Sequence, residues 1–327
     1  MDTNTRFIVI GASAGGRAAI TEILTTLPKD INAVIAIVVH GSYHAPSMFV
    51  KALSAKTELK VKEVENGMEI QIGHVYICKP NLHLYVSEHK LCLSRGPREN
   101  LFRPAVDVLF RSAAVSFGNK CVGILLTGRL NDGTSGLEAI KRCGGLTLIQ
   151  NPATAEYGDM PASAQRHVDI DYVVNLDDMS DVIKGILDED LPESVSIPKS
   201  LVKENNIANK YESQVEKDEK LGHQVSISCP SCAGPLWKME DTKVKRYRCH
   251  IGHAFTQEAL LKSQDDSLEE ALWLALRTLE ERRMLLEKMS ADSTKDGLKH
   301  LSKSYSSKLS EVSKHIGKLR DVLQLHD

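Results

Sequence analysis

The first 187 residues alternate between short apolar runs and helical patterns, and this alternation constrains the fold more than any other feature of the chain. The apolar runs have the length and composition of buried strands, and helical periodicity lies between them. Strands are expected at 7–11, 34–40, 74–78, 122–126, 147–150 and 172–175, and helices at 17–26, 47–54, 105–117, 135–143 and 179–187. This order predicts an α/β fold with a doubly wound, mostly parallel sheet covered on both faces. Residues 82–93 alternate as strands do and predict an antiparallel hairpin on the edge of that sheet.

Charge and hydropathy exclude several classes of protein. The 327 residues hold 41 Lys and Arg against 43 Asp and Glu, so no global field favours nucleic acid or an anionic membrane. The longest apolar run, 31–39, is much shorter than the roughly 20 residues of a membrane span, and no secretory signal precedes it. Four cysteines without paired spacing indicate reduced thiols and a cytoplasmic protein: Cys78, Cys92, Cys121 and Cys143.

The chain beyond the α/β region changes character three times. The α/β region is expected to form one domain at 1–187. Residues 188–224 are polar and broken by proline, which predicts a solvated linker. A compact cysteine-bearing module is expected at 225–256 and a helical tail at 257–327. Ser267 and Glu270 match a capping box, and later apolar residues have 3-4 spacing, so the tail is expected to be a helical hairpin or a dimerising coiled coil.

The loop after the first strand, "GASAGG" at 11–16, allows three interpretations. Ser13 replaces the middle glycine of a dinucleotide-binding G-x-G-x-x-G, it is also the nucleophile position of a G-x-S-x-G elbow, and small residues suit a plain tight turn. A dinucleotide site needs an acidic residue at the end of the second strand, but that strand ends in His40. A histidine there suits a general base better than a ribose contact.

A serine nucleophile needs an imidazole to take its proton and a carboxylate to orient that imidazole. The fourth expected strand runs into a glycine-rich loop that carries Asp132. Because parallel strands end at the same edge of a sheet, Ser13, His40 and Asp132 are expected to meet there. The residue pattern alone leaves both the triad and the structural turn open.

His167 is the alternative base, since the chain order of α/β-hydrolases is Ser, Asp, His. It lies at the end of a short expected helix, where a surface or capping role is favoured. The remaining histidines of the first domain lack a strand-end setting and are expected on the surface or in loops: His44, His74, His83 and His89.

Several motifs together resemble one family. "IGASAGG" with Ser13, "VVH" with His40, "RPAVDVLFRSAA" from Arg103, "GILLTGRLNDGTSGLEAIKRCGG" around Asp132 and "NPATAEYGDMPASA" from Asn151 have the order and spacing of the catalytic domain of chemotaxis protein-glutamate methylesterases, the CheB family. The resemblance covers residues 5–187 and implies a doubly wound, mostly parallel sheet. It favours the nucleophile interpretation of Ser13.

The resemblance implies a hydrolase that demethylates glutamate 5-O-methyl esters on chemoreceptors or related signalling proteins, releases methanol and also deamidates glutamine. The family's triad falls on Ser13, His40 and Asp132, and the reaction needs no metal or nucleotide. The chain begins six residues before its first expected strand, so no receiver domain and no regulation by phosphorylation within this polypeptide are expected.

The expected oxyanion and substrate loop is where the chain departs from the family. Backbone N–H groups of Ala14 and Gly15 are expected to hold the oxyanion, with help from the loop that starts at Gly128 and Arg129. The family has Thr-Gly-Met-Gly where this chain has Thr-Gly-Arg-Leu, and Leu130 replaces a glycine whose backbone has positive φ. The alternative to an esterase is therefore a non-catalytic or differently specific signalling adaptor.

The cysteine-bearing module has the ligand spacing of a metal site. Cys229-x2-Cys232, sixteen residues and then Cys249-x3-His253 form a Cys3His set, which is typical of a structural zinc site. A module this small has too little core to fold without such support. His250 is the alternative fourth ligand, and a redox CxxC lacks the surrounding βαβ pattern. We expect the module to be a scaffold and the tail to mediate homodimer or partner contacts.

Overall fold

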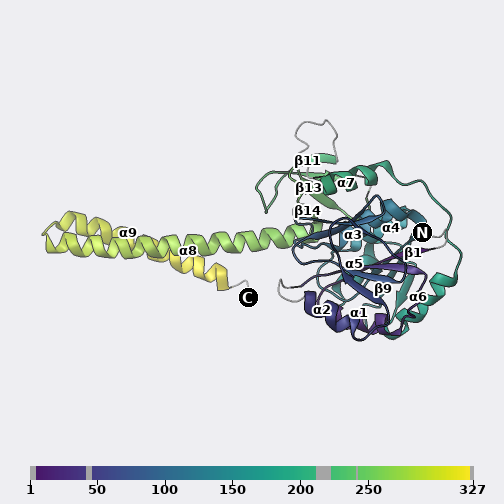
Figure 1. The fold of residues 1–327 in the computed structure, drawn as a ribbon. Coiled ribbons are helices and arrows are strands. Elements are labelled where there is room, and N and C mark those ends of the chain that lie inside the picture. The colour runs from purple at the N-terminus through teal and green to yellow at the C-terminus, as the bar shows by residue number, and fades with distance from the viewer. Residues whose placement is uncertain (1–4, 42–45, 211–221, 241, 325–327) are drawn as a thin grey trace. The chain divides into compact units, whose positions relative to one another are not determined.

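The computed structural model describes residues 5–41, 46–210, 222–240 and 242–324. The chain divides into two compact units, residues 1–260 and 261–327. The first unit contains the α/β domain and the cysteine-bearing module (Figure 1). No helix within the described ranges is long and apolar enough to cross a membrane.

A seven-stranded sheet forms the centre of the α/β domain, and all of its paired strands are parallel. In sheet order the strands are β10 (Tyr172–Val174), β9 (Leu146–Gln150), β8 (Cys121–Leu125), β1 (Arg6–Ala12), β2 (Ala33–Val39), β5 (His74–Ile77) and β3 (Lys60–Glu63). The chain extends from β1 towards β3 and then returns to β8 on the other side of β1. The expected doubly wound sheet is confirmed, and its switch point brings the ends of β1, β2 and β8 together.

Helices cover both faces of this sheet. They are α1 (Gly16–Thr26), α2 (Pro46–Ser54), α3 (Val106–Phe117), α4 (Thr134–Arg142), α5 (Asp159–His167) and α6 (Met179–Asp188), with short 3-10 helices at Gly118–Lys120 and Leu176–Asp178. One apolar core joins Ile8 and Ile10 of β1 to α1 and α6, and the other joins Phe7 and Val9 to α3 and α4. Successive β1 residues are therefore buried on opposite faces, with α1 and α6 on one side and α3 and α4 on the other (Figure 1).

The expected hairpin forms, but its position was predicted wrongly. Strands β6 (His83–Ser87) and β7 (Lys90–Ser94) join β4 (Met68–Glu69) in a separate three-stranded antiparallel sheet, while β3 occupies the edge of the main sheet. Leu84 and Leu91 of the hairpin are buried in the core that includes α3. The Val86 N–H also donates to the Ser112 hydroxyl of α3 at 3.0 Å. The hairpin is thus held by a helix face and not by the main sheet.

The segment expected to be a solvated linker contains helix α7 (Lys199–Lys210). Leu201 is buried in the α3 core, and Glu204 is 3% exposed. The expectation failed for this part of the segment because α7 is anchored by one apolar residue and by buried ion pairs to distant arginines. Contacts of this kind do not produce the repeating apolar pattern by which a buried helix is recognised in a sequence.

The cysteine-bearing module is a four-stranded antiparallel sheet of β11 (Gly222–Ser228), β12 (Pro235–Met239), β13 (Arg246–Cys249) and β14 (Ala254–Thr256). Leu236 and Phe255 pack with the buried cysteines in its small core. Glu138 of α4 accepts hydrogen bonds from the N–H groups of Lys243 and Val244, at 2.6 and 3.2 Å. The module is therefore hydrogen-bonded directly to the α/β domain.

Helix α8 (Gln257–Lys295) begins in the first unit. From Leu261 on it forms the second unit, a helical hairpin, together with α9 (Lys299–Gln324). Leu286 of α8 packs with Val312 and Ile316 of α9. The predicted capping box was wrong, because Ser267 lies inside α8 and its hydroxyl donates to the Ser263 carbonyl at 2.8 Å.

Candidate functional site

The ends of β1, β2 and β8 place the three predicted catalytic residues at one edge of the sheet. Ser13 follows β1 and His40 follows β2, and the parallel register pairs Ala12 with Val39 immediately before them. The His40 N–H donates to the Ala12 carbonyl, and the Ser13 N–H donates to the carbonyl of Thr127, both at 3.0 Å. The residue after β2 is therefore hydrogen-bonded to the end of β1, and the residue after β1 to the loop after β8.

His40 and Asp132 form a buried pair. The imidazole Nε2 lies 2.8 Å from the carboxylate Oδ2, and the two side chains are 5% and 0% exposed. Because a carboxylate accepts hydrogen bonds, Nε2 carries a hydrogen, and in the neutral imidazole Nδ1 then has a free lone pair. Nδ1 is buried and has no hydrogen-bond partner among the residues that the structure describes. It is the nitrogen that can take a proton from a hydroxyl.

The described contacts include no hydrogen bond between the Ser13 hydroxyl and His40. Catalytic hydrogen bonds are often long without substrate and shorten in the substrate complex. The structure thus brings Ser13 to the end of the strand beside His40 and forms the His40–Asp132 contact directly.

Asp132 is held by five hydrogen bonds, counting the one from His40. Oδ2 also accepts the Val106 N–H at 2.6 Å, at the start of α3. Oδ1 accepts the Asn100 amide at 2.9 Å and the N–H groups of Gly133 and Asp107 at 3.1 and 3.2 Å. These donors come from three separate segments and fix the plane of the carboxylate that orients His40.

Asn100 and Asp107 are site residues that the sequence reasoning missed. The Asn100 amide donates to Asp107 Oδ2 at 2.7 Å as well as to Asp132, so it bridges two buried carboxylates. Asp107 Oδ1 accepts the N–H groups of Gly136 and Gly133 at 2.6 and 3.0 Å. Burial and the charge of Asp132 raise the pKa of Asp107. Asp107 lies inside the quoted "RPAVDVLF" motif, which was the available signal, whereas Asn100 had none.

Phe102 is a further neighbour of the site. Its ring stacks on the His40 imidazole with centroids 3.7 Å apart and planes 11° apart. The stacking covers one face of the imidazole and limits its rotation.

Gly128, in the loop after β8, lies directly against Ser13 and Met160. A Cβ on Gly128 would lie 2.7 Å from Cβ of Ser13 and 2.1 Å from Sδ of Met160, so only glycine allows this approach. The Gly128 N–H donates to the Tyr157 carbonyl at 2.9 Å. The Gly128 N–H is therefore paired inside the protein, and a role of Gly128 in holding the oxyanion or the substrate stays a prediction.

Arg129 and Leu130 continue that loop. Arg129 is exposed, and its guanidinium lies 4.8 Å from the centroid of the Tyr157 ring. Leu130 has φ of 66°, so the backbone keeps the left-handed conformation although the residue is not glycine.

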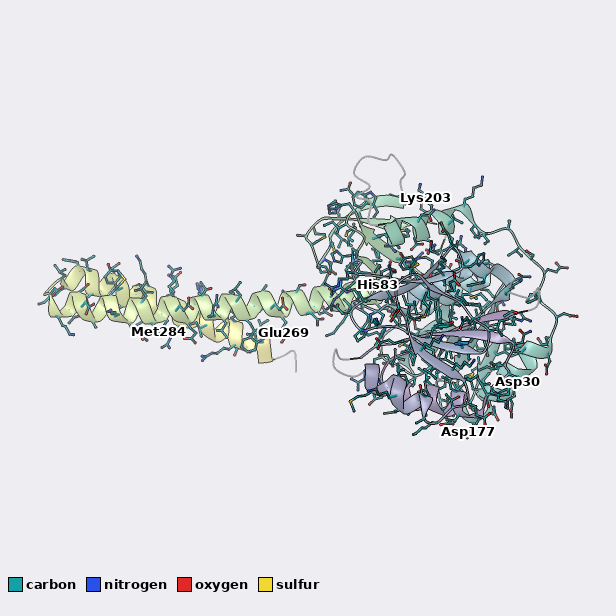
Figure 2. The ribbon with its side chains drawn as sticks, in the orientation of Figure 1. Asp30, His83, Asp177, Lys203, Glu269 and Met284 are labelled. Carbon is teal, nitrogen blue, oxygen red and sulfur yellow. The ribbon has the colours of Figure 1, made fainter. Side chains whose placement is uncertain are left out.

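The other histidines of the first domain that the structure describes form no hydrogen bond or ion pair with His40, Asp132 or Ser13. His167 ends α5 and its Nδ1 lies 2.9 Å from the Ser163 carbonyl of the same helix. His74 and His83 were expected at the surface, but they are 7% and 2% exposed within strands (Figure 2 labels His83). Burial lowers the pKa of His83, whose ring nitrogens contact the Pro97 carbonyl and the Ala105 N–H. His44 lies outside the described residues.

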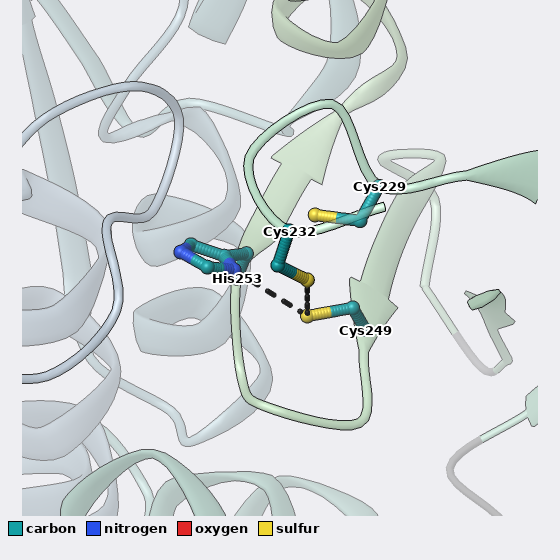
Figure 3. A group of neighbouring side chains, drawn as sticks. All are labelled: Cys229, Cys232, Cys249 and His253. Atoms are coloured by element: carbon teal, nitrogen blue, oxygen red, sulfur yellow. Dashed lines mark hydrogen bonds between the residues drawn. The ribbon is translucent and has the colours of Figure 1, made fainter. Parts of the chain in front are cut away.

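The four predicted metal ligands come together in the module. The ligand atoms of Cys229, Cys232, Cys249 and His253 all lie within 4.8 Å of one another, and Figure 3 shows the four side chains converging. Sγ of Cys249 is 3.7 Å from Sγ of Cys232 and 3.5 Å from Nδ1 of His253. Zinc–sulfur bonds of about 2.3 Å in a tetrahedron would place sulfur atoms about 3.8 Å apart. The cluster can bind a metal ion.

His250, the alternative ligand, is outside this cluster. It is exposed and packs beside Gly234 and Trp237. The backbone turn from Cys249 to His253 supports His253 as the fourth ligand, because the Cys249 N–H donates to the His253 carbonyl at 2.9 Å.

Comparisons with known proteins agree on one family. The family model described as CheB methylesterase matches residues 8–183, more than half of the chain. A curated protein of Leptospira interrogans is 40% identical over 180 residues, which are 55% of this chain and 93% of that protein. A Burkholderia pseudomallei protein, named protein-glutamate methylesterase/protein-glutamine glutaminase 1, is 38% identical over 54% of this chain and 49% of its own length. The crystal structure of the Thermotoga maritima CheB methylesterase catalytic domain is 31% identical, with a TM-score of 0.54 over 56% of this chain and 98% of that one.

Proposed function

The chain belongs to the CheB methylesterase family, and on this premise we propose that it is a serine hydrolase that demethylates glutamate 5-O-methyl esters of chemoreceptors or related signalling proteins. The observation that carries this proposal is the buried His40–Asp132 pair beside the loop of Ser13. The names of the relatives support the substrate class. They give no support to a non-catalytic adaptor.

In the first step, the Ser13 hydroxyl attacks the ester carbonyl and His40 Nδ1 takes its proton. The free lone pair on Nδ1 supports this assignment, since Nε2 is hydrogen-bonded to Asp132. Asp132 keeps the imidazole in the required tautomer and stabilises its charged form.

In the second step, the tetrahedral intermediate collapses to an acyl-enzyme on Ser13, and His40 returns the proton to the departing methoxide to give methanol. A water molecule then attacks the acyl-enzyme while His40 takes one of its protons. Collapse of this second intermediate breaks the bond to Ser13, His40 returns the proton to the Ser13 oxygen, and the released glutamate side chain ionises to a carboxylate. Deamidation of glutamine follows the same course with ammonia as the leaving group, and the relatives' names include it.

The oxyanion is proposed to bind at the start of α1. Ala14 and Gly15 directly follow Ser13, and Gly15 has φ of 75° at the N-terminus of this helix. Backbone N–H groups at a helix start favour negative charge. Arg129, exposed at the neighbouring loop, is proposed to contact the protein substrate.

The metal proposed for the module is zinc, in a structural role. Three thiolates and one imidazole favour Zn²⁺ and leave no open coordination position. The ion would link the loop between β11 and β12 to the loop between β13 and β14. The esterase reaction itself uses none of these four residues.

The helical hairpin is proposed to mediate self-association or contact with a partner protein. Large apolar side chains of α8 are more than half exposed within the second unit: Leu261, Leu268, Trp273, Leu274, Met284 and Leu285. Exposed apolar surface of this kind is typical of contact sites.

The test is methanol release from a methyl-labelled chemoreceptor cytoplasmic fragment. The Ser13→Ala variant is expected to lose the activity by about four orders of magnitude or more, because the nucleophile is gone. Ser54→Ala, which removes an exposed helix hydroxyl bonded to the Val50 carbonyl, is the matched control and is expected to keep the wild-type rate. Undiminished release by Ser13→Ala would refute the assignment, and no release by the folded wild type would favour the adaptor.

A further inference from the structure

Four consecutive residues, Glu99 to Phe102, connect the cysteine-bearing module to the His40–Asp132 pair, which we call the catalytic pair. We call residues 99–102 the connector. Glu99 forms ion pairs with the α/β domain and with the module, and Asn100 bridges the carboxylates of Asp107 and Asp132. Leu101 packs against the apolar core of the module, and Phe102 stacks on His40. Each side chain of the connector therefore contacts the module, the catalytic pair or their direct supports.

Strand β14 of the module fixes Asn100. The Asn100 N–H donates to the Ala254 carbonyl at 2.8 Å, and the Thr256 N–H donates to Asn100 Oδ1 at 2.9 Å. Because Oδ1 accepts from β14, the NH₂ group of the same amide must point the other way, towards acceptors. Those acceptors are the carboxylates of Asp107 and Asp132.

The connector has an unfavourable backbone that the module helps to hold. Asn100 has φ of 49° and Leu101 has φ of 75°, both in the left-handed region. Asparagine tolerates this region, but leucine rarely adopts it. The packing of Leu101 with the module core, which includes Cys229 and Cys249, offsets this strain.

Buried ion pairs also link the module to the α/β domain and to α7. Glu99 accepts from Arg111 of α3 and from Arg248 of β13, at 2.9 and 2.8 Å. Glu204 of α7 pairs with Arg246 of β13 at 2.6 Å and with Arg111 at 3.3 Å. All five side chains are at most 7% exposed. Buried ions are stable only with their partners, and the module supplies two of the three arginines.

The module also fixes the residue that precedes Asp132. The Thr256 hydroxyl donates to Asn131 Oδ1 at 3.0 Å, and the Asn131 amide donates to Glu258 Oε2 at 2.9 Å. Contacts from β14 and the start of α8 therefore reach both the Asp132 loop and the connector.

We infer that Asn100 is a positioning residue for Asp132 and that the folded cysteine-bearing module holds Asn100 in place, so that the module sets the geometry of the His40–Asp132 pair. The scaffold role expected from the sequence becomes a role in the active site. The consequence for hydrolysis rests on the proposed esterase function, but the geometry itself does not.

The first experiment compares full-length wild type with Asn100→Ala. One readout is the downfield proton resonance of the His40 Nε2–H bonded to Asp132, which needs no substrate. The second is the rate at which a fluorophosphonate labels Ser13, and the third is kcat and KM for methanol release. Asn100→Ala is expected to weaken or lose the resonance, and to slow labelling and kcat by about a hundredfold with KM unchanged.

Asn119→Ala is the matched control. It removes a side-chain amide that donates to the Pro192 carbonyl at 2.6 Å. Asn119 precedes β8, so it lies at the opposite end of that strand from Thr127. It is expected to change neither resonance nor labelling. Asn100→Ser, which keeps a short donor, is expected to recover part of both and serves if the alanine variant does not fold. A folded Asn100→Ala or Asn100→Ser variant with wild-type resonance and labelling would overturn the positioning role.

The second experiment loosens the module without changing the connector. Phe255→Ala removes a core side chain that is 2% exposed, and limited proteolysis between 222 and 256 reports the loosening. We expect the His40 resonance to broaden and the labelling rate to fall about tenfold as the module opens. A module that is cleaved while the resonance and labelling keep wild-type values would overturn the coupling. If wild type shows the resonance but neither labelling nor methanol release, the proposed function fails and the resonance still tests the coupling.

Discussion

Leu130 shows how one residue can retain a backbone conformation that its side chain disfavours. Its φ of 66° lies in the left-handed region, two residues before Asp132. Left-handed backbone costs a residue with Cβ about 1–2 kcal/mol. The loop keeps this conformation although the family's glycine is absent. The surrounding contacts must therefore offset the free-energy cost of the left-handed backbone.

We predict that Leu130→Gly is more stable than Leu130→Ala by about 1 kcal/mol, because both variants lose the isobutyl group but only glycine removes the left-handed strain. Urea unfolding of the two variants measures the difference. The alanine variant is the control for lost packing. Equal stabilities, or a more stable alanine variant, would show that the loop is not strained at this residue.

At the residue scale, some residues of the candidate site could be predicted from the sequence and others could not. Ser13, His40 and Asp132 could be found because each follows a strand whose apolar run is readable. Asn100 could not, since its importance comes from a carbonyl on β14 and two carboxylates far away in the chain. The free Nδ1 of His40 also required the structure, because no pattern reveals which ring nitrogen faces Asp132.

At the scale of elements, helix α7 is held by charge more than by apolar contact. Its Glu204 accepts from Arg246 at 2.6 and 2.9 Å, and all of these groups are buried. Removing one member of a buried ion network leaves its partners uncompensated and costs about 3–5 kcal/mol. The same charge pattern on an exposed helix contributes little.

We predict that Glu204→Gln lowers the free energy of unfolding at neutral pH by about 3 kcal/mol, measured by urea unfolding. Asp181→Asn, which breaks an exposed pair with Lys184, is the control and is expected to cost about 1 kcal/mol or less. Similar losses in both variants would mean that α7 is not anchored by its buried carboxylate.

The same network predicts a pH dependence. Burial alone would raise the pKa of Glu99, but the charges of Arg111 and Arg248 outweigh it and lower the pKa to about 2. Arg246 and Arg111 likewise hold the pKa of Glu204 far below its usual range despite burial. The unfolded chain then binds more protons than the folded one, so stability present above pH 4.5 is lost as pH falls towards 2. Glu204→Gln is expected to show a shallower fall than wild type, and equal slopes would contradict the network.

Elements were predictable where the apolar pattern is local. The six expected strands of the main sheet match β1, β2, β5, β8, β9 and β10 to within one residue at each end. Strand β3 was missed because its exposed and half-buried residues give no buried run. Helix α7 was missed because its partners, arginines of β13, lie about forty residues away.

At the scale of the whole molecule, the proposed zinc ion supports a module with a very small core. We predict one equivalent of zinc per chain, lost in Cys232→Ser, with residues 222–256 becoming sensitive to proteolysis. Elemental analysis and proteolysis measure this. Cys92→Ser, at an unpaired cysteine of β7, is the control and should retain the ion. Full zinc content in Cys232→Ser would contradict the Cys3His site.

The second unit makes a separate prediction about assembly. We predict that the full chain self-associates through the helical hairpin and that a chain ending at Leu260, the boundary of the first unit, is a monomer. Light scattering gives both masses. If the two chains have the same oligomeric state, the hairpin does not drive self-association, and its exposed apolar side chains serve another contact.

The wide separation of the connector and the module along the chain has a consequence for protein synthesis. Asn100 and Thr256 are 156 positions apart, and at about 5–20 residues per second a ribosome needs roughly 10–30 s to pass from one to the other. During that interval the nascent α/β domain can bury its sheet, but the carboxylate bridge has no β14 to fix it. The site is therefore expected to become competent late in translation, after the module at 222–256 has emerged.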